Sequence, residues 1–341
     1  MKERIAVDKY SKALLRKVPE DVLAEELGEK YTDYRKRWHD AQTFKVRTPF
    51  PIHLDIELSY KCNLKCIMCP YGDPTYVHPA YKGQSLDTSR IKEIIKEGVP
   101  LGLSALRYNG LSEPLLEKSL VELIRYAKEN GILDIFLTTN GMLLNKKMAI
   151  DLIESGLTHI MVSIDAATAE TYNKIRVGGN YERVVKNVNR FLEIRENLGS
   201  QLPVFRLTYT KMQPNIGEVN AFVDMWKDKV DHIAIAGYLN NIQNKEQNDN
   251  LACTPLRPSA QTEFHCWQPW SRCTIFSNGD VFPCCMNYGR STPVGNIFKE
   301  DLTSIWQSDR VRFIQDINRK GEYFKDPTCK ACVSKRDIFE A

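Results

Sequence analysis

Strand-like and helix-like segments alternate through the middle of this 341-residue chain, and this alternation restricts the fold more than any other feature. Short stretches with period-two or apolar character predict strands, and longer stretches with helical periodicity lie between them. The predicted strands are 52–58, 104–108, 134–138, 159–164, 204–209 and 232–236. The helical segments between them include 117–129, 146–154, 181–198 and 216–226. Such an order predicts an α/β fold with a parallel sheet and right-handed crossovers, and leaves a barrel and a doubly wound sheet both open.

Three cysteines follow the first predicted strand at the spacing C-x3-C-x2-C. They are Cys62, Cys66 and Cys69. A short loop lets their sulfurs converge, and thiolates prefer iron or zinc to hard cations. A structural zinc site normally has four protein ligands, so a local set of three indicates a centre with one open position. A zinc knuckle completed by a distant residue remains the alternative.

The segment Cys62-Asn63-Leu64-Lys65-Cys66-Ile67-Met68-Cys69 resembles the cluster motif of the radical S-adenosylmethionine (SAM) enzymes. In that family three cysteines hold a [4Fe-4S] cluster, and the remaining iron binds the amino and carboxylate groups of SAM. The resemblance implies that these three cysteines are ligands and that the alternating segments fold as a partial (β/α)6 TIM-like barrel. It also implies a small-molecule substrate and a reductant such as flavodoxin or ferredoxin.

The residues after the second predicted strand resemble the family's glycine-rich segment that ends in Glu-Pro. By this resemblance Glu113 receives the amino group of SAM, although Leu111 and Ser112 replace the usual small residues. The alternative role for Glu113 is to cap the helix that begins near Leu115, where a negative charge is favourable.

Polar residues at later strand ends resemble other SAM contacts of the family. Asn140 and Ser163 match positions near the ribose and methionine portions, and so does Asp165. Asp165 could instead cap the helix that begins near Ala169. Arg176 ends a Tyr-x-x-x-Arg segment and is implied to pair with the carboxylate of SAM, which suits a guanidinium fork.

The other seven cysteines all lie beyond residue 250, which predicts a second metal-bearing region. They are Cys253, Cys266, Cys273, Cys284, Cys285, Cys329 and Cys332. An Asn-Gly pair at 278–279 predicts a hairpin between them. The order of these elements resembles the SPASM or twitch domain of many radical SAM enzymes. The resemblance implies one auxiliary [4Fe-4S] cluster held by Cys266, Cys284, Cys329 and Cys332. Cys285 could replace Cys284, and a zinc ribbon is the alternative site.

Three regions are expected: a helical N-terminal extension (1–47), the barrel (48–245) and the cluster domain (246–341). The charged N-terminus and the lack of a long apolar run predict a cytoplasmic protein without a membrane partner. In such a chain, ten cysteines indicate metal binding rather than disulfides. The net charge of +4 is small and dispersed, so nucleic acid is not expected as a partner.

A single auxiliary cluster resembles the dehydrogenases of aminoglycoside and aminocyclitol biosynthesis. We therefore expect an oxidoreductase of antibiotic biosynthesis. A 5′-deoxyadenosyl radical would abstract hydrogen from a carbinol carbon of a sugar or aminocyclitol, and the auxiliary cluster would take the electron as a ketone forms. One alternative is an epimerase in which Cys253 or Cys273 returns a hydrogen atom. Others are a maturase of peptides and, outside enzymes, a zinc or iron–sulfur scaffold.

Overall fold

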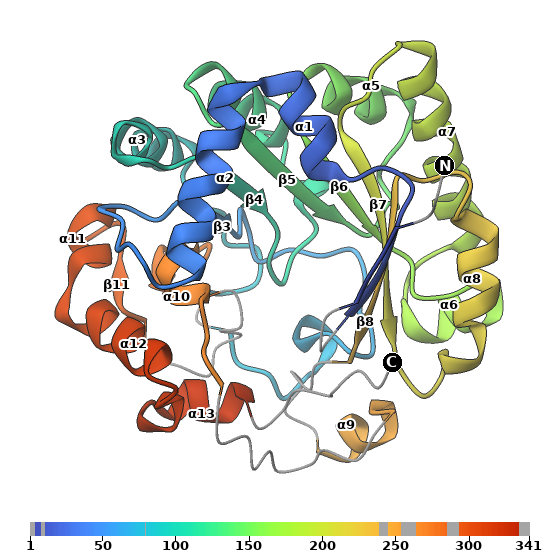
Figure 1. Ribbon diagram of the computed structural model, residues 1–341. Helices are drawn as coiled ribbons and strands as arrows, with labels where there is room; N and C mark the ends of the chain where they lie inside the picture. The colour runs from blue at the N-terminus through green and yellow to red at the C-terminus, as the bar shows by residue number, and fades with distance from the viewer. Residues whose placement is uncertain are drawn as a thin grey trace.

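The computed structural model describes residues 4–7, 11–78, 80–238, 245–253, 264–284 and 293–333. At its centre six parallel strands stand in chain order and form a partial barrel (Figure 1). These are β3 (His53–Ile56), β4 (Ala105–Tyr108), β5 (Asp134–Thr139), β6 (His159–Ser163), β7 (Val204–Lys211) and β8 (His232–Gly237). Each coincides with one of the six strands that the sequence predicts. The expectation of a partial (β/α)6 barrel is confirmed.

Helices follow the strands and cover the outside of the barrel (Figure 1). They are α3 (Thr88–Gly98), α4 (Leu120–Glu129), α5 (Lys146–Glu154), α6 (Ala169–Ile175), α7 (Tyr181–Asn197) and α8 (Val219–Trp226). Short 3-10 turns join them: η1 (Pro70–Gly72), η2 (Val99–Leu101), η3 (Pro114–Leu116) and η4 (Ile216–Glu218). The order of strand, helix and strand places every connection from strand to helix at the same end of the barrel, as in other barrels of this kind.

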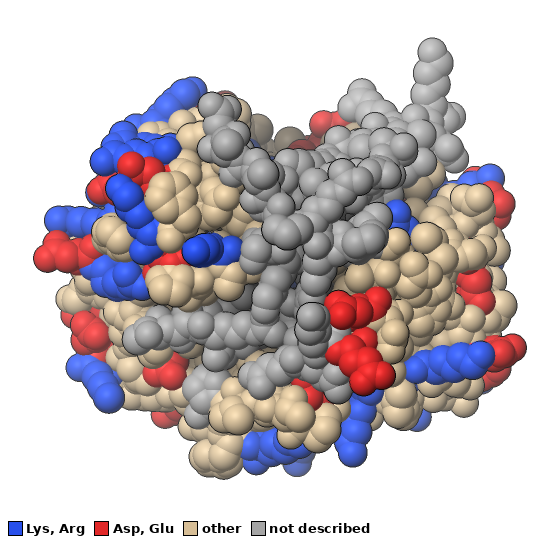
Figure 2. Space-filling model, turned by 90° about the horizontal axis from the view of Figure 1, so that it is seen from below, with Lys and Arg blue, Asp and Glu red and all other residues tan. Residues whose placement is uncertain are grey.

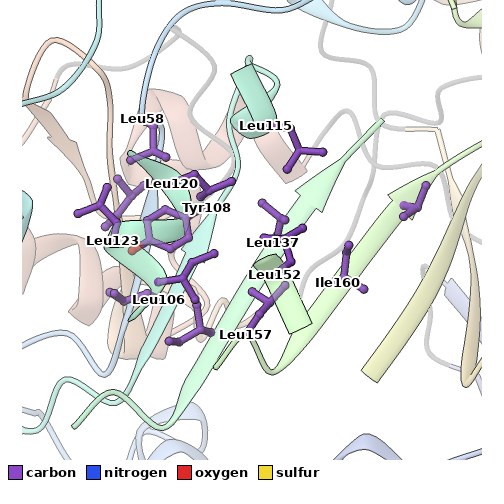
Figure 3. Packing of buried hydrophobic residues seen from close by; sticks show 14 of the residues in the cluster. Leu58, Leu106, Tyr108, Leu115, Leu120, Leu123, Leu137, Leu152, Leu157 and Ile160 are labelled. Atoms are coloured by element: carbon purple, nitrogen blue, oxygen red, sulfur yellow. The ribbon is translucent and has the colours of Figure 1, made fainter. Parts of the chain in front are cut away.

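The main hydrophobic core lies between the strands and these outer helices. Helix α4 shows the pattern, because its fully buried residues Leu120, Leu123, Ile124 and Ala127 recur with helical spacing. They pack beside Leu106, Tyr108 and Leu137 on the outward face of the sheet (Figure 3). The alternate strand positions point into the barrel and are mostly polar. The register sets Asp55 beside Arg107 and sets Phe136 beside His159 on that inner face.

The N-terminal region differs from the expected helical extension. Helices α1 (Pro19–Leu27) and α2 (Glu29–Gln42) are present, but a hairpin of β1 (Arg4–Val7) and β2 (Ser11–Leu15) precedes them. Strand β2 pairs antiparallel with β8, from Ser11 opposite Ala236 to Leu15 opposite His232. The prediction that this region contains only helices is wrong, because the free edge of β8 supplies hydrogen-bonding partners that local sequence does not reveal.

The C-terminal region continues the same sheet from its other edge. Strand β9 (Arg272–Ile275) pairs parallel with β3, and it turns at Asn278 and Gly279 into β10 (Asp280–Phe282). Gly279 has φ +85°, which confirms the expected turn. The remaining elements are α9 (Lys245–Leu251), α10 (Gln268–Ser271), β11 (Gly295–Asn296), α11 (Leu302–Gln307), α12 (Asp309–Arg319), η5 (Tyr323–Lys325) and α13 (Pro327–Val333).

Two surface properties bear on partners. In the part of the chain that the structure describes, every helix is too short or too polar to cross a membrane. Figure 2 shows basic and acidic side chains next to one another on both sides of one face, and no continuous basic stripe crosses its described part.

Candidate active site

The three cysteines Cys62, Cys66 and Cys69 lie on the loop that follows β3. Backbone hydrogen bonds fix this loop to the end of α6: Lys65 N–H donates to Val177 O at 2.8 Å and Ile67 N–H donates to Ile175 O at 3.0 Å. The amide of Cys69 donates to Cys66 O at 3.0 Å and closes a turn. All three thiols are free of disulfides and at least half-buried. The fold therefore gathers them at the end of the barrel to which the strands point.

The donor set of this loop, three thiols without a fourth protein ligand in the same loop, fits a cluster with one open iron. Burial raises the pKa of Cys62 to about 11 and that of Cys69 to about 12, and the neighbouring sulfurs add to both shifts. A metal that binds here must therefore displace thiol protons. Among the described residues, no three His, Cys, Asp or Glu side chains form a group that could hold one metal ion. In a [4Fe-4S] cluster each cysteine binds its own iron, so its thiolates spread more widely than around one zinc.

Glu113 lies fully buried between the cysteine loop and β5. Its Oε2 accepts a hydrogen bond from Asn140 N–H at 2.7 Å, and its Oε1 accepts from Thr139 Oγ1 at 2.6 Å and from Leu115 N–H at 3.1 Å. Burial raises the pKa of Glu113, and these three donors oppose the rise. Its own amide donates to Lys61 O at 2.8 Å. Glu113 does cap the first turn after β4, as the alternative expected, and a role in binding SAM stays a prediction.

Asn140 and Ser163 stand at neighbouring strand ends, as expected. The Nδ2 of Asn140 donates to Asn63 Oδ1 at 2.9 Å, which ties the end of β5 to the cysteine loop. The Oγ of Ser163 accepts from Thr208 Oγ1 at 3.0 Å across β6 and β7. Both side chains lie at the mouth of the barrel with the cysteines.

Asp165 and Arg176 form a buried ion pair beside the cysteines. The Nη1 of Arg176 also lies 3.6 Å from Cys66 Sγ. Asp165 accepts a second hydrogen bond from Thr210 N–H at 2.7 Å. The cap of α6 is instead Thr168, so the alternative that Asp165 caps this helix is wrong. The Nε of Arg176 is buried without a hydrogen-bond partner within the described part of the chain, which leaves one donor for a ligand.

Three of the C-terminal cysteines, Cys266, Cys329 and Cys332, lie near one another in a second place. Burial raises the pKa of Cys329 to about 12, Asn318 opposes the rise through its hydrogen bond, and the nearby Cys266 and Cys332 reinforce it. Cys284 follows β10, and its carbonyl accepts from Thr274 Oγ1 at 3.0 Å. Cys285 lies outside the described residues, so the choice between Cys284 and Cys285 stays a prediction.

The two cysteines considered as hydrogen donors lie in different surroundings. Cys273 is buried in the main core, opposite Leu54 in the register, while its neighbour Arg272 points into the barrel. The Cys273 thiol therefore lies on the face of the sheet away from the barrel interior, which argues against it as a hydrogen donor. Cys253 follows α9, and its carbonyl accepts from Gln213 Nε2 at 3.5 Å.

A cationic cavity of about 460 Å³ inside the barrel was not expected from the sequence. Arginines and histidines from the inner face of the strands line it, together with residues of α1 and α2. These side chains are Arg107, Arg206, Arg272, His53, His159 and His232. The carboxylates of Glu20 and Asp134 also line the cavity, so its basic groups are partly balanced. The sequence did contain a sign of this cavity. Arg107 and Arg206 lie inside two of the predicted strands, where a buried charge requires a partner.

The electrostatics of this cavity favour an anion. Arg107 donates to Thr138 Oγ1 at 3.1 Å, and no carboxylate of the described residues lies within 4 Å of it. Burial lowers the pKa of His232 to about 3, and the positive charge of Arg206 and His159 lowers it further. Burial acts to raise the pKa of Asp55, but Arg272, His53 and Arg107 together hold this pKa well below its usual range. Burial is the main cause of the lowered pKa of His232, and the arginine charge acts in the same direction.

Comparison with known proteins agrees with these two cysteine groups. Residues 56–209 match the Radical SAM superfamily, and residues 266–333 match the SPASM iron-sulfur cluster-binding domain. The chain is 29% identical over 305 residues to a probable GTP 3′,8-cyclase of Methanococcus maripaludis, covering 81% of this chain and 95% of the relative. It is 36% identical over 183 residues to the GTP 3′,8-cyclase of Thermodesulfovibrio yellowstonii, covering 53% of each.

Solved structures support the fold. Streptococcus suis SuiB bound to S-adenosylmethionine has a TM-score of 0.60 and 18% identity, over 96% of this chain and 92% of that chain. At that identity the likeness concerns the fold alone.

These relatives correct the expected activity. The expectation of a sugar or aminocyclitol dehydrogenase is wrong, because the similar curated proteins are named for the cyclisation of GTP. The expected class of oxidoreductase and the expected role in antibiotic biosynthesis are therefore not supported either. The expected cofactors stand, since a radical SAM domain implies a [4Fe-4S] cluster with SAM and a SPASM domain implies an auxiliary cluster. The chain contains a radical SAM domain and a C-terminal SPASM domain.

Proposed function

We propose that this enzyme acts on a purine nucleoside triphosphate and joins its ribose to its base, as the name of the GTP 3′,8-cyclases describes. The observation that carries the proposal is the cationic cavity inside the barrel, with Arg107 at its wall and no carboxylate oxygen of the described residues within 4 Å of its guanidinium. The relative from Methanococcus maripaludis adds support, because the similarity extends over 95% of its length.

One end of the barrel offers groups that bind a triphosphate, and the other end offers the site where the sugar and base would react. The arginines Arg107, Arg206 and Arg272 come from the inner face, and a guanidinium fork binds phosphate oxygens in pairs. The cysteine loop and the pair of Asp165 and Arg176 lie beyond the opposite, carboxyl ends of the strands. A triphosphate held among the arginines would direct the sugar and base towards the cysteines.

The residues of the chain would orient and shield the reacting groups. The cluster, when bound and reduced, supplies the electron that cleaves SAM to methionine and a 5′-deoxyadenosyl radical. Glu113 and the free Nε of Arg176 offer an acceptor for an ammonium and a donor for a carboxylate, the two charged groups of methionine. The inner wall at Phe136 and Met161 would exclude water from a sugar radical. Ring closure requires the two carbons to be held about 3–3.5 Å apart, which phosphate anchoring at one end favours.

The test uses the reconstituted, reduced enzyme with SAM and GTP that carries deuterium at C3′. We expect one deuterium in the 5′-deoxyadenosine and a cyclised product with the mass expected for closure between C3′ and C8. If the deuterium stays in GTP while SAM is cleaved, GTP is not the substrate and the proposal is wrong.

Arg107→Met tests the role of the cavity. We expect the KM for GTP to rise about tenfold or more, because a charge-assisted hydrogen bond contributes about 1.5–3 kcal/mol. The matched control is Arg125→Met, which removes an exposed arginine on the outside of α4 and should leave the KM unchanged. Equal KM values for the two variants would count against phosphate binding in the barrel.

A further inference from the structure

Glu57 is a fully buried carboxylate between β3 and the cysteine loop, and the chemistry proposed above makes no use of it. Its Oε2 accepts a hydrogen bond from Leu111 N–H at 3.0 Å. Its Oε1 accepts from Ser277 Oγ at 2.9 Å and lies 3.4 Å from His78 Nε2. One side chain thus contacts three segments that are distant in the sequence.

His78 faces Glu57 in a fixed tautomer. Its Nδ1 accepts a hydrogen bond from Ala80 N–H at 3.0 Å, so the ring proton is on Nε2, the atom that faces the carboxylate. The ring is stacked between Tyr60, with centroids 3.9 Å apart, and Phe276, with centroids 5.0 Å apart. His78 therefore joins the segment before the cysteines to the hairpin of the SPASM region.

The segment that carries Glu57 and two of the segments that it contacts, those of Leu111 and Ser277, each lead directly into a cofactor-binding part of the protein. Tyr60 is followed by Cys62, Leu111 by Glu113, and the hairpin that carries Ser277 by Cys284. The backbone of the second segment approaches closely: a Cβ on Gly110, which has φ +134°, would lie 2.7 Å from Glu57 Cγ. A shift of Glu57 would therefore displace the segment that carries Glu113 as well as the hairpin.

We propose that Glu57 is a positioning residue that fixes the SPASM hairpin against the cysteine loop and the Glu113 segment, so that the two cluster sites keep one mutual geometry. A carboxylate suits this role because both of its oxygens accept hydrogen bonds. Glutamine has one acceptor oxygen, so its NH₂ group would face a donor on one side. This role concerns the two clusters and holds whatever the substrate is.

Hydrogen exchange of the whole chain tests the contacts of Glu57 without any cofactor. In Glu57→Gln the amide of Leu111 should exchange roughly tenfold faster, because a hydrogen bond to a charged group contributes about 1.5–3 kcal/mol. The control is Glu97→Gln. Glu97 lies on the outer helix α3 and accepts hydrogen bonds from Thr303 N–H at 2.9 Å and from Thr303 Oγ1 at 2.6 Å. It therefore forms a similar link between the barrel and the SPASM region. Unchanged exchange at Leu111 in Glu57→Gln would overturn the proposal.

A second measurement uses the loaded enzyme. The magnetic interaction between the two reduced clusters should change or broaden in Glu57→Gln and remain native in Glu97→Gln. Ser277→Ala removes the shorter of two contacts with the hairpin, the hydroxyl at 2.9 Å, and leaves the Ser277 N–H at 3.4 Å from Glu57 Oε1. It should reproduce the change in weaker form while the exchange of the Leu111 amide stays slow. If Glu57→Gln does not fold, Ser277→Ala alone decides, and a native spectrum in that variant refutes the proposal. These readouts need no GTP, so they can fail while the proposed function stands.

Discussion

At the scale of single residues, most of the site chemistry depends on how buried charges are matched. Arg176 is balanced by Asp165 and lies against Cys66, whereas the hydrogen-bond acceptors of Arg107 among the described residues are a hydroxyl and a thioether, Thr138 Oγ1 and Met161 Sδ. The first arrangement gives a stable structural element beside the cysteines. The second leaves positive potential inside the barrel for a ligand to neutralise.

Removing one member of the buried pair should destabilise the protein strongly. Arg176→Met leaves the Asp165 carboxylate buried without its partner, and we expect a loss of about 3–5 kcal/mol in the free energy of unfolding. The double variant Arg176→Met with Asp165→Asn removes both charges and should recover part of the loss. Urea unfolding of the two single variants and the double variant measures this. Additive losses would show that the pair does not interact.

His232 should make the protein less stable in mild acid. Its pKa of about 3 in the folded protein lies below the usual value of about 6.5 in an unfolded chain. As the pH falls through this interval, the unfolded chain gains a proton that the folded chain excludes, so stability decreases. Between pH 7 and pH 5 the loss is about 2 kcal/mol, from about 1.4 kcal/mol per pH unit.

The comparison with His232→Phe isolates this effect from other titrations. The variant keeps an aromatic ring beside Arg206 but has no group that titrates. The difference in unfolding free energy between the two proteins should grow in favour of the variant as the pH is lowered from 7 to 5. A constant difference would show that His232 does not resist protonation.

At the scale of elements, local sequence patterns predict what local interactions stabilise. The apolar spacing of α4 and the alternating residues of β4 are visible in the sequence, and the two elements pack as expected (Figure 3). The N-terminal hairpin was missed, because β2 owes its conformation to pairing with β8, more than 200 residues away. The pairing of β9 with β3 was likewise invisible, although the turn at Asn278 and Gly279 was predicted.

The core face of α4 gives a direct test of this packing. Leu123→Ala should reduce the free energy of unfolding by about 2–5 kcal/mol, because it removes a fully buried side chain and leaves a cavity. Glu122→Ala on the same helix loses an exposed ion pair with Lys92 and should cost less than about 1 kcal/mol. If chemical denaturation gives similar losses of unfolding free energy for the two variants, α4 does not pack against the sheet as described.

At the scale of the whole molecule, one continuous sheet links the regions of the two cysteine groups, because β3, which precedes the first group, pairs with β9 of the C-terminal region. The reconstituted protein should hold about eight irons, from two four-iron clusters. Cys266→Ala should reduce this to about four, whereas Cys273→Ala should keep all of it because Cys273 packs in the hydrophobic core. Iron and sulfide analysis with the absorbance of each variant provides the measurement. Equal iron content in the two variants would exclude Cys266 as a ligand.

The same analysis separates Cys284 from Cys285. Loss of about half of the iron in Cys284→Ala, with full iron in Cys285→Ala, is the result that we expect from the position of Cys284 directly after the hairpin. The reverse result would assign the ligand to Cys285.

The sequence by itself determined the parallel strands, the cysteine loop and the two cluster regions, because periodicity and ligand spacing are local properties of a chain. It also indicated Glu113, Asn140, Ser163, Asp165 and Arg176, which the structure gathers around the mouth of the barrel or the cysteine loop. Only the tertiary structure decided which neighbours those side chains have, that Cys273 faces the core, and that arginines from separate strands share one cavity. Contacts of this kind depend on strand register and on pairing between distant segments, and a single residue shift would turn each of those side chains to the other face of the sheet.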